Sequence, residues 1–200
     1  MGPLNTPTPP LWADHVLRQP RVLLLDHLQC EMKAATTALS LVAKNPGRVE
    51  LVEPLLEVAE EELEHYRLLH ELARRRGYQP EPITPSPYMS TLRRRAGAMP
   101  HQPLLDRLLI AALVEARSCE RFRLLADRGQ DSELGALLRE LVGAEARHFG
   151  LYVELARRLY GDRLTSSRLS ALAILESEIL ANLPVSGALH SGWLHLDTEP

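Results

Sequence analysis

The sequence predicts an all-α protein made of long helices that pack on one another. Three observations support this fold class. The 200-residue chain is 45% hydrophobic but only 4% aromatic, whereas β-sheets favour aromatic and β-branched side chains. Apolar residues recur at helical spacing over long stretches, and no stretch alternates as a half-buried strand does. Glycine and proline residues stand where such helices would end.

Five long helices are predicted, each with a start or stop signal. Pro20 suits the first turn of the first helix, Asp131 or Ser132 caps the fourth, and Ser166 or Ser167 caps the fifth. The expected ranges are about 21–44, 49–76, 103–128, 132–160 and 167–181. The stop signals are Asn45-Pro46-Gly47, Gly77, Gly129 and Gly161.

The remaining segments predict the connections. Residues 78–100 contain five prolines and are expected to form a long crossover, because they cannot form one helix. Residues 1–19 are expected to be an arm that can include a short helix at 11–18. Residues 20–182 would form one helical domain, and residues 183–200 a tail. Two helical hairpins, one long crossover and an added C-terminal helix are the connectivity of a ferritin-like four-helix bundle.

Composition excludes several classes of protein. No run of about 18 apolar residues is present, so no membrane span and no membrane partner are expected. The N-terminus has no basic start followed by an apolar stretch, so no secretory signal is expected. Cys30 and Cys119 are the only cysteines and cannot form a disulfide scaffold. These features predict a cytoplasmic protein, and the net charge of −3 gives the whole chain no nucleic-acid signature.

The basic residues are nevertheless concentrated in one region. Lys33 and Lys44 are the only lysines among 23 basic residues. Residues 74–95 hold six arginines and one acid, Glu81. Either this region is a solvated loop beside helix ends, or it binds phosphate groups. The six arginines are Arg74, Arg75, Arg76, Arg93, Arg94 and Arg95.

Two Glu-x-x-His motifs suggest a metal site. Glu62 and His65 lie one helical turn apart, and so do Glu145 and His148. At 100° per residue, each pair shares a face with the apolar residues of its helix. The other acids of the second helix are expected to face solvent; they include Glu53, Glu57, Glu60 and Glu64.

The first and third helices each add one acid to an apolar stripe. Glu31 lies on the apolar face of the first helix. On the third helix, Glu115 shares the apolar face, whereas Glu120 lies about 140° around it. The two halves of the chain repeat at an offset of 83 or 84 residues, which relates Glu31 to Glu115 and each motif to the other. The repeat therefore favours Glu115 over Glu120.

Four buried carboxylates require compensating charge. Two divalent cations would supply it, and four Glu with two His suit iron or manganese. The alternative is that core arginines such as Arg117 or Arg147 neutralise the acids. His27, one turn from Glu31, is either a satisfied core residue or a support for the site.

Five segments of the chain carry a resemblance to a known family. They are Leu25–Ala35, Glu61–His65, Val114–Phe122, Glu145–Phe149 and Leu189–Gly192. Together they resemble the tRNA-(2-methylthio-N6-isopentenyladenosine) hydroxylase (MiaE) family over about residues 20–192. The Glu-Ala-Arg-Ser-Cys-Glu-Arg-Phe run is its most specific part.

The resemblance implies a ferritin-like non-haem diiron monooxygenase that uses O₂ and an external reductant, such as a ferredoxin- or flavodoxin-like partner. It implies hydroxylation of the isopentenyl group of the modified adenosine beside the tRNA anticodon. With tRNA as partner, phosphate binding by the six arginines gains weight. The alternatives are a ferritin-like iron oxidase or storage protein, a diiron oxidase of a small molecule, and a metal-free helical interaction protein. The implied ligands are Glu31, Glu62, His65, Glu115, Glu145 and His148.

Overall fold

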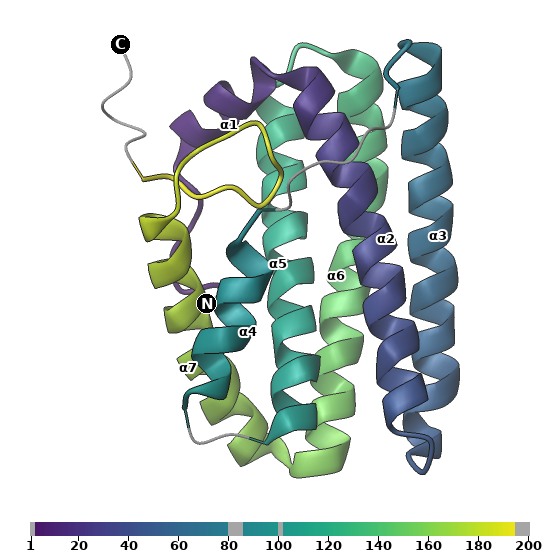
Figure 1. The fold of residues 1–200 in the computed structure, drawn as a ribbon, viewed down its shortest axis with the longest axis vertical. Helices are drawn as coiled ribbons and strands as arrows, with labels where there is room; N and C mark the ends of the chain where they lie inside the picture. Colours follow the sequence, from purple (N-terminus) through teal and green to yellow (C-terminus); the bar gives the residue numbers. More distant parts are fainter. Residues whose placement is uncertain (1–2, 80–85, 100–101, 195–200) are drawn as a thin grey trace. The chain divides into compact units, whose positions relative to one another are not determined.

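A computed structural model describes residues 3–79, 86–99 and 102–194, and these residues are mostly helical. No extended strand occurs among them; Pro184 and Leu194 form an isolated bridge. None of the described helices is long and apolar enough to cross a membrane. In chain order the elements are α1 (Pro10–Leu17), α2 (Pro20–Lys44), η1 (Val49–Leu51), α3 (Val52–Arg75), α4 (Tyr88–Gly97), α5 (Pro103–Arg128), α6 (Ser132–Tyr160) and α7 (Asp162–Asn182) (Figure 1).

The four long helices expected before Gly161 are confirmed. Proline occupies the first turn of α2 and of α5, where its missing N–H costs nothing. The Asp131 side chain caps α6 by accepting a hydrogen bond from the backbone N–H of Leu134 at 3.0 Å. Gly77, directly after α3, has a φ of +70°, a conformation that glycine adopts without steric cost.

The start expected for the last helix is wrong. α7 begins at Asp162 rather than near 167, so Ser166 and Ser167 lie inside it. Gly161 alone separates α6 from α7, with a φ of +80°. One left-handed residue is enough to end a helix, and the acid at position 162 favours the start of the next.

The crossover contains a helix that the proline count obscured. Prolines exclude one helix over 78–100, yet α4 fits between Pro87 and Pro100, with Pro87 as its N-cap residue. Proline is tolerated at a helix start. Pro80, Glu81, Pro82, Pro85 and Pro100 lie outside the described residues.

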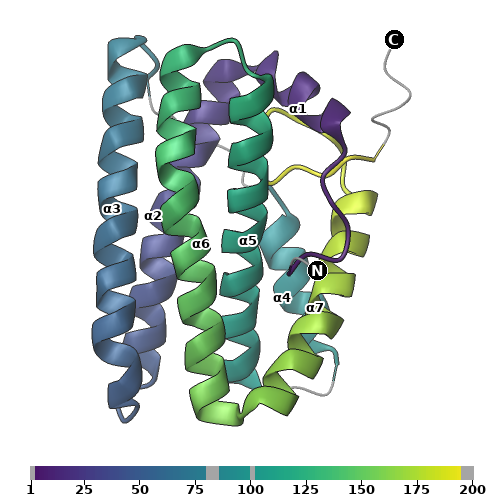
Figure 2. The same ribbon diagram turned by 180° about the vertical axis from the view of Figure 1, so that it is seen from behind.

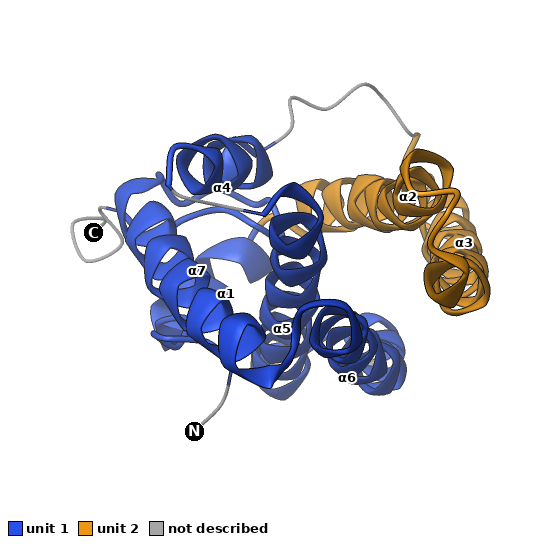
Figure 3. Ribbon diagram, turned by 90° about the horizontal axis from the view of Figure 1, so that it is seen from below, with its two compact units in different colours: residues 1–18, 86–200 blue, residues 19–85 orange. Residues whose placement is uncertain are grey.

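The chain forms two compact units, shown in Figure 3. Unit 2, residues 19–85, is the hairpin in which α2 and α3 pack side by side. Unit 1, residues 1–18 and 86–200, holds a second hairpin of α5 and α6, together with α1, α4 and α7. Figure 2 shows α5 and α6 of that hairpin from the opposite side.

Described residues near both ends of the chain pack within unit 1. The residues expected to form a tail include a buried loop after α7 at Leu189–Ser191. Trp12 of α1 donates its indole N–H to the Ser191 hydroxyl at 3.0 Å. A Cβ at Gly192 would lie 2.0 Å from the Leu183 carbonyl oxygen. Only glycine therefore fits at this close approach.

Candidate metal centre

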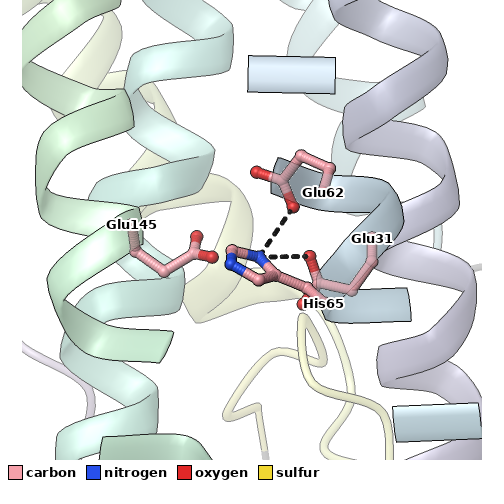
Figure 4. Close-up of side chains that lie close together, drawn as sticks. All are labelled: Glu31, Glu62, His65 and Glu145. Atoms are coloured by element: carbon pink, nitrogen blue, oxygen red, sulfur yellow. Dashed lines mark hydrogen bonds and ion pairs between the residues drawn. The ribbon is translucent and has the colours of Figure 1, made fainter. Parts of the chain in front are cut away.

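In unit 2, two carboxylates and one imidazole converge inside the hairpin. Glu31 comes from α2, Glu62 and His65 come from α3, and all three are buried. Each offers one ligand atom, and these atoms lie within 4.8 Å of one another. His65 Nδ1 is 3.3 Å from Glu62 Oε2 and 3.9 Å from Glu31 Oε2 (Figure 4).

This cluster holds the Glu31 carboxylate ionised. Burial by itself raises the pKa of Glu31, but the neighbouring His27 and His65 imidazoles outweigh it and hold the pKa well below its usual range. Burial also lowers the pKa of His65, whereas hydrogen bonds with Glu31 and Glu62 raise it to about 10. In the metal-free protein, His65 therefore carries a proton beside Glu31 and Glu62. A bound cation would replace that proton, as metal ligands must be deprotonated.

His27 supports the cluster from α2. It is almost fully buried, and its Nε2 forms an ion pair with Glu31 Oε1 one turn along the helix. Of the two interpretations of His27, the structure favours a residue that orients Glu31. Fixing the carboxylate of a metal ligand in this way is what partners behind the ligands do in metal sites.

In unit 1, the α5–α6 hairpin carries the corresponding group. Glu115 lies on α5, Glu145 and His148 lie on α6, and all three are buried. Their ligand atoms also lie within 4.8 Å of one another. The two hairpins thus present matching groups of two carboxylates and one imidazole, as the repeat in the sequence predicts.

Helical phase explains which acids are buried. On α3, Glu62 is fully buried, whereas the acids expected on the wet face are exposed; they are Glu53, Glu57, Glu60 and Glu64. Helix α3 has exposed carboxylates on one side and apolar residues on the other. Because Glu62 and His65 share the apolar side, they point toward the buried face.

The structure also separates Glu115 from Glu120. The Glu120 side chain is 25% exposed. Its Oε1 accepts a hydrogen bond from the backbone N–H of Thr8 at 2.7 Å, and Arg117 Nη1 donates to its Oε2 at 2.6 Å. The outward position expected of Glu120 is confirmed.

The main ion-pair partner of Arg117 is not one of the six predicted ligands. It donates to both carboxylate oxygens of Glu176 on α7, from Nε at 2.9 Å and from Nη2 at 2.8 Å. Arg147 is exposed, so it is no core arginine. The alternative that a core Arg117 neutralises these acids is therefore wrong, and Arg147 does not lie in the core.

The donor atoms fit iron. Carboxylate oxygens and imidazole nitrogens are the ligands of non-haem iron and manganese sites. A Glu-x-x-His motif on one helix with a Glu on its neighbour is the inward-facing arrangement of di-metal carboxylate bundles. Each hairpin supplies one such half set from buried positions.

Comparisons with known proteins place the chain in a family. Residues 2–191 match the family described as tRNA-(MS[2]IO[6]A)-hydroxylase (MiaE). This chain belongs to the MiaE family.

Two curated relatives carry the same description. The chain is 40% identical over 192 residues to the "tRNA 2-(methylsulfanyl)-N(6)-isopentenyladenosine(37) hydroxylase" of Pseudomonas putida, covering 94% of this chain and 92% of that protein. It is 28% identical over 241 residues to the hydroxylase of that name from Salmonella typhimurium, covering 94% of this chain and 87% of that protein.

A solved structure shares the fold of this MiaE family member. It is "Protein 43 with aldehyde deformylating oxygenase activity from Synechococcus", with a TM-score of 0.90 and 35% sequence identity. The match covers 96% of this chain and 97% of that one. The fold is thus all-α and ferritin-like, as the order and length of the helices predict.

The arginines expected to bind tRNA differ in their surroundings. At the end of α3, Arg74 donates to Glu71 from Nε and Nη2, both at 2.8 Å, and Arg75 lies 3.5 Å from the same carboxylate. These hydrogen bonds from Arg74 lower the pKa of Glu71 to about 2. On α4, Arg95 pairs with Glu178 at 2.9 Å. Arg76, Arg93 and Arg94 complete the set predicted from the sequence.

The sequence did not predict a buried hydrogen-bonded network in unit 1. Its centre is the Arg117–Glu176 pair, to which the Tyr88 hydroxyl also donates, at 3.1 Å from Glu176 Oε1. His190 stacks on the Tyr88 ring with centroids 5.2 Å apart. The similarity of Leu189–Gly192 to the family was the available signal, but it did not indicate any partner.

Proposed function

We propose that this member of the MiaE family hydroxylates the isopentenyl group of 2-methylthio-N6-isopentenyladenosine beside the tRNA anticodon. The observation that carries the proposal is the pair of buried Glu, Glu and His groups in a chain of this family. In the balanced reaction, one oxygen atom of O₂ enters an allylic C–H bond. The other oxygen atom is reduced to water, which takes up two protons and two electrons that an external reductant supplies.

The proposed centre is a diiron site. Its ligands are Glu31, Glu62, His65, Glu115, Glu145 and His148. Two metal cations would offset the charge of the four carboxylates, whose burial is otherwise costly. When bound, the two irons would supply the electrons that activate O₂.

The chain's own residues have separate tasks. The four glutamates and two histidines hold the cations, and His27 orients the Glu31 carboxylate through their ion pair. Apolar neighbours on the same helix faces, such as Leu55, Leu69 and Leu141, are buried and exclude water from the ligands. Exclusion of water favours a reactive site, because competing reactions with solvent are prevented.

The partners in this proposal are tRNA and an electron donor of the ferredoxin or flavodoxin type, and the compartment is the cytoplasm. The tRNA would be bound through arginines on α3 and α4, because guanidinium groups match phosphate oxygens with two parallel hydrogen bonds. The set is Arg74, Arg75, Arg76, Arg93, Arg94 and Arg95.

The test is nucleoside analysis of tRNA from cells that make the prenylated, methylthiolated base. Cells that express this protein should contain a nucleoside with one additional oxygen atom, and cells without it should not. A Glu62→Ala variant, expressed at the same level, should give no such nucleoside. Absence of the hydroxylated nucleoside in cells with the wild-type protein and sufficient iron would contradict the proposal.

A second candidate is an oxygenase of a small molecule, which the likeness to the Synechococcus protein with aldehyde deformylating oxygenase activity favours. Purified, iron-loaded protein with a reductant and O₂ would then consume an aldehyde. The same protein would leave the modified tRNA unchanged.

A further inference from the structure

The arginines of α4 lie on different sides of the buried face of this helix. Leu92 and Ala96 are buried, and α4 packs against α5 and α7. At 100° per residue, Arg93 and Arg95 flank the buried Leu92 on opposite sides. Arg95 lies on the side of α7, where it pairs with Glu178 at 2.9 Å. Arg93 therefore lies on the side of α5.

A buried hydrogen-bonded junction fixes α4 to the start of α5. Arg168 of α7 donates to both oxygens of Asp106 on α5, each at 2.7 Å. It also donates to the Ala96 carbonyl oxygen of α4, at 3.2 Å. This junction holds Arg93, one turn before Gly97, near Arg107, the residue after Asp106.

Three arginines bring positive charge to the region where α4 meets the start of α5. Burial lowers the pKa of the half-buried Arg107, and the nearby charge of Arg93 lowers it further. Arg93 and Arg94 are exposed, and neither has an ion-pair partner among the described residues. We call Arg93, Arg94 and Arg107 the α4 ridge.

Two acids near the ridge, among the described residues, are paired with other arginines. Asp106 is paired with Arg168, and Glu178 is paired with Arg95. Arg93 and Arg107 are like charges close enough to repel each other, and an anion that binds them relieves this repulsion.

We infer that the α4 ridge binds backbone phosphates of tRNA, with Arg107 as a contact that the sequence pattern did not indicate. This inference rests on the proposed function. RNA is the partner because its backbone presents closely spaced anions, and because arginine binds phosphate oxygens with its planar fork. Buried hydrogen bonds join the two helices that carry the ridge, so the ridge is preformed, which lowers the entropic cost of binding.

The inference also ranks the predicted arginines. On α3, Glu71 forms ion pairs with Arg74 and Arg75. A phosphate group that binds these arginines must therefore compete with the Glu71 carboxylate. Arg93 and Arg94 face no such competition among the described residues. The α4 ridge should therefore contribute more to tRNA affinity than the arginines at the end of α3.

The experiment measures binding of full-length tRNA carrying the modified adenosine to the full-length protein at several salt concentrations. The ridge variant is Arg93→Gln, Arg94→Gln and Arg107→Gln. Its matched control removes the same charge from exposed ion pairs elsewhere, with Arg48→Gln, Arg67→Gln and Arg158→Gln. The ridge variant should lower the slope of log affinity against log salt by about 2, since each phosphate contact contributes about 0.7–0.9. The control should keep the wild-type slope and affinity.

Circular dichroism and iron content keep the result interpretable. A folded ridge variant with wild-type tRNA affinity and salt slope would overturn the inference. So would a ridge variant that binds tRNA normally but accepts electrons slowly from an acidic flavodoxin, because the ridge would then serve the reductant. Should the triple variant fail to fold, the exposed pair Arg93→Gln and Arg94→Gln gives the same test with a slope change of about 1.5. The proposed function is tested separately, because wild-type protein that binds tRNA through the ridge without hydroxylating it would refute only the function.

Discussion

Two kinds of buried charge occur in this protein, and they are neutralised differently. In the α2–α3 hairpin, the Glu31 and Glu62 carboxylates meet imidazole groups. Between α5 and α7, the equally buried Glu176 meets the guanidinium of Arg117, held by two hydrogen bonds. Guanidinium is always charged and satisfies a carboxylate permanently, whereas imidazole can give up its proton to a metal. The first arrangement suits a site that binds a cation, and the second suits a structural support.

If the buried carboxylates of the first kind bind metal, the largest loss of hydroxylation is expected on substitution of Glu115. Glu115→Ala should abolish hydroxylation because it removes a proposed ligand, whereas Glu120→Ala should retain activity and affect only stability. Hydroxylated nucleoside in tRNA, measured by mass spectrometry, checks both variants. Loss of activity in the Glu120 variant alone would reverse the assignment of these acids.

The structural pair should dominate stability. Glu176→Ala leaves Arg117 buried without its main partner, and should lower the free energy of unfolding by about 3–5 kcal/mol. Glu178→Ala on the same helix removes an exposed carboxylate and should cost less than about 1 kcal/mol. Urea unfolding of the metal-free proteins gives both values. Similar losses in the two variants would show that the buried pair has no special role.

The imidazoles should control metal content. His65→Ala and His148→Ala should each weaken iron binding at least about tenfold, because even residues behind metal ligands contribute that much. The exposed His70 on α3 is the matched control, and His70→Ala should keep the wild-type iron content. Iron per chain, measured by mass spectrometry of the metal after dialysis, is the readout. Full occupancy in both motif variants would rule out the proposed ligand set.

The smallest effect is expected where the N-terminal arm joins the arginine network. The Thr8 hydroxyl donates to Glu120 Oε2 at 2.7 Å and accepts from Arg117 Nη1 at 3.1 Å. Thr8→Val should therefore cost about 1–2 kcal/mol in the free energy of unfolding. Thr36→Val, at an exposed position of α2, should change it by less than about 0.5 kcal/mol. Equal effects in thermal unfolding would mean that the arm is not held by Thr8.

The sequence by itself determined the long helices and the faces they bury. Apolar spacing, Pro20 and Asp131 act within one or two turns, so their effect can be predicted without a fold. The same local periodicity placed Glu62 and His65 on a buried face, and it separated Glu115 from Glu120. Membership of the family confirms the resemblance that five segments of the sequence carry.

Only the tertiary structure decided which groups meet across the chain. The Arg117–Glu176 pair joins residues 59 positions apart, and the Trp12–Ser191 bond joins residues 179 apart. No local pattern specifies such partners, because they depend on how helices pack after they form. Helix α4 was obscured by the prolines around it, and its buried face packs against α5 and α7 only in the folded unit. Local physics thus predicted which faces of the helices are buried, and long-range packing decided which charged groups pair inside unit 1.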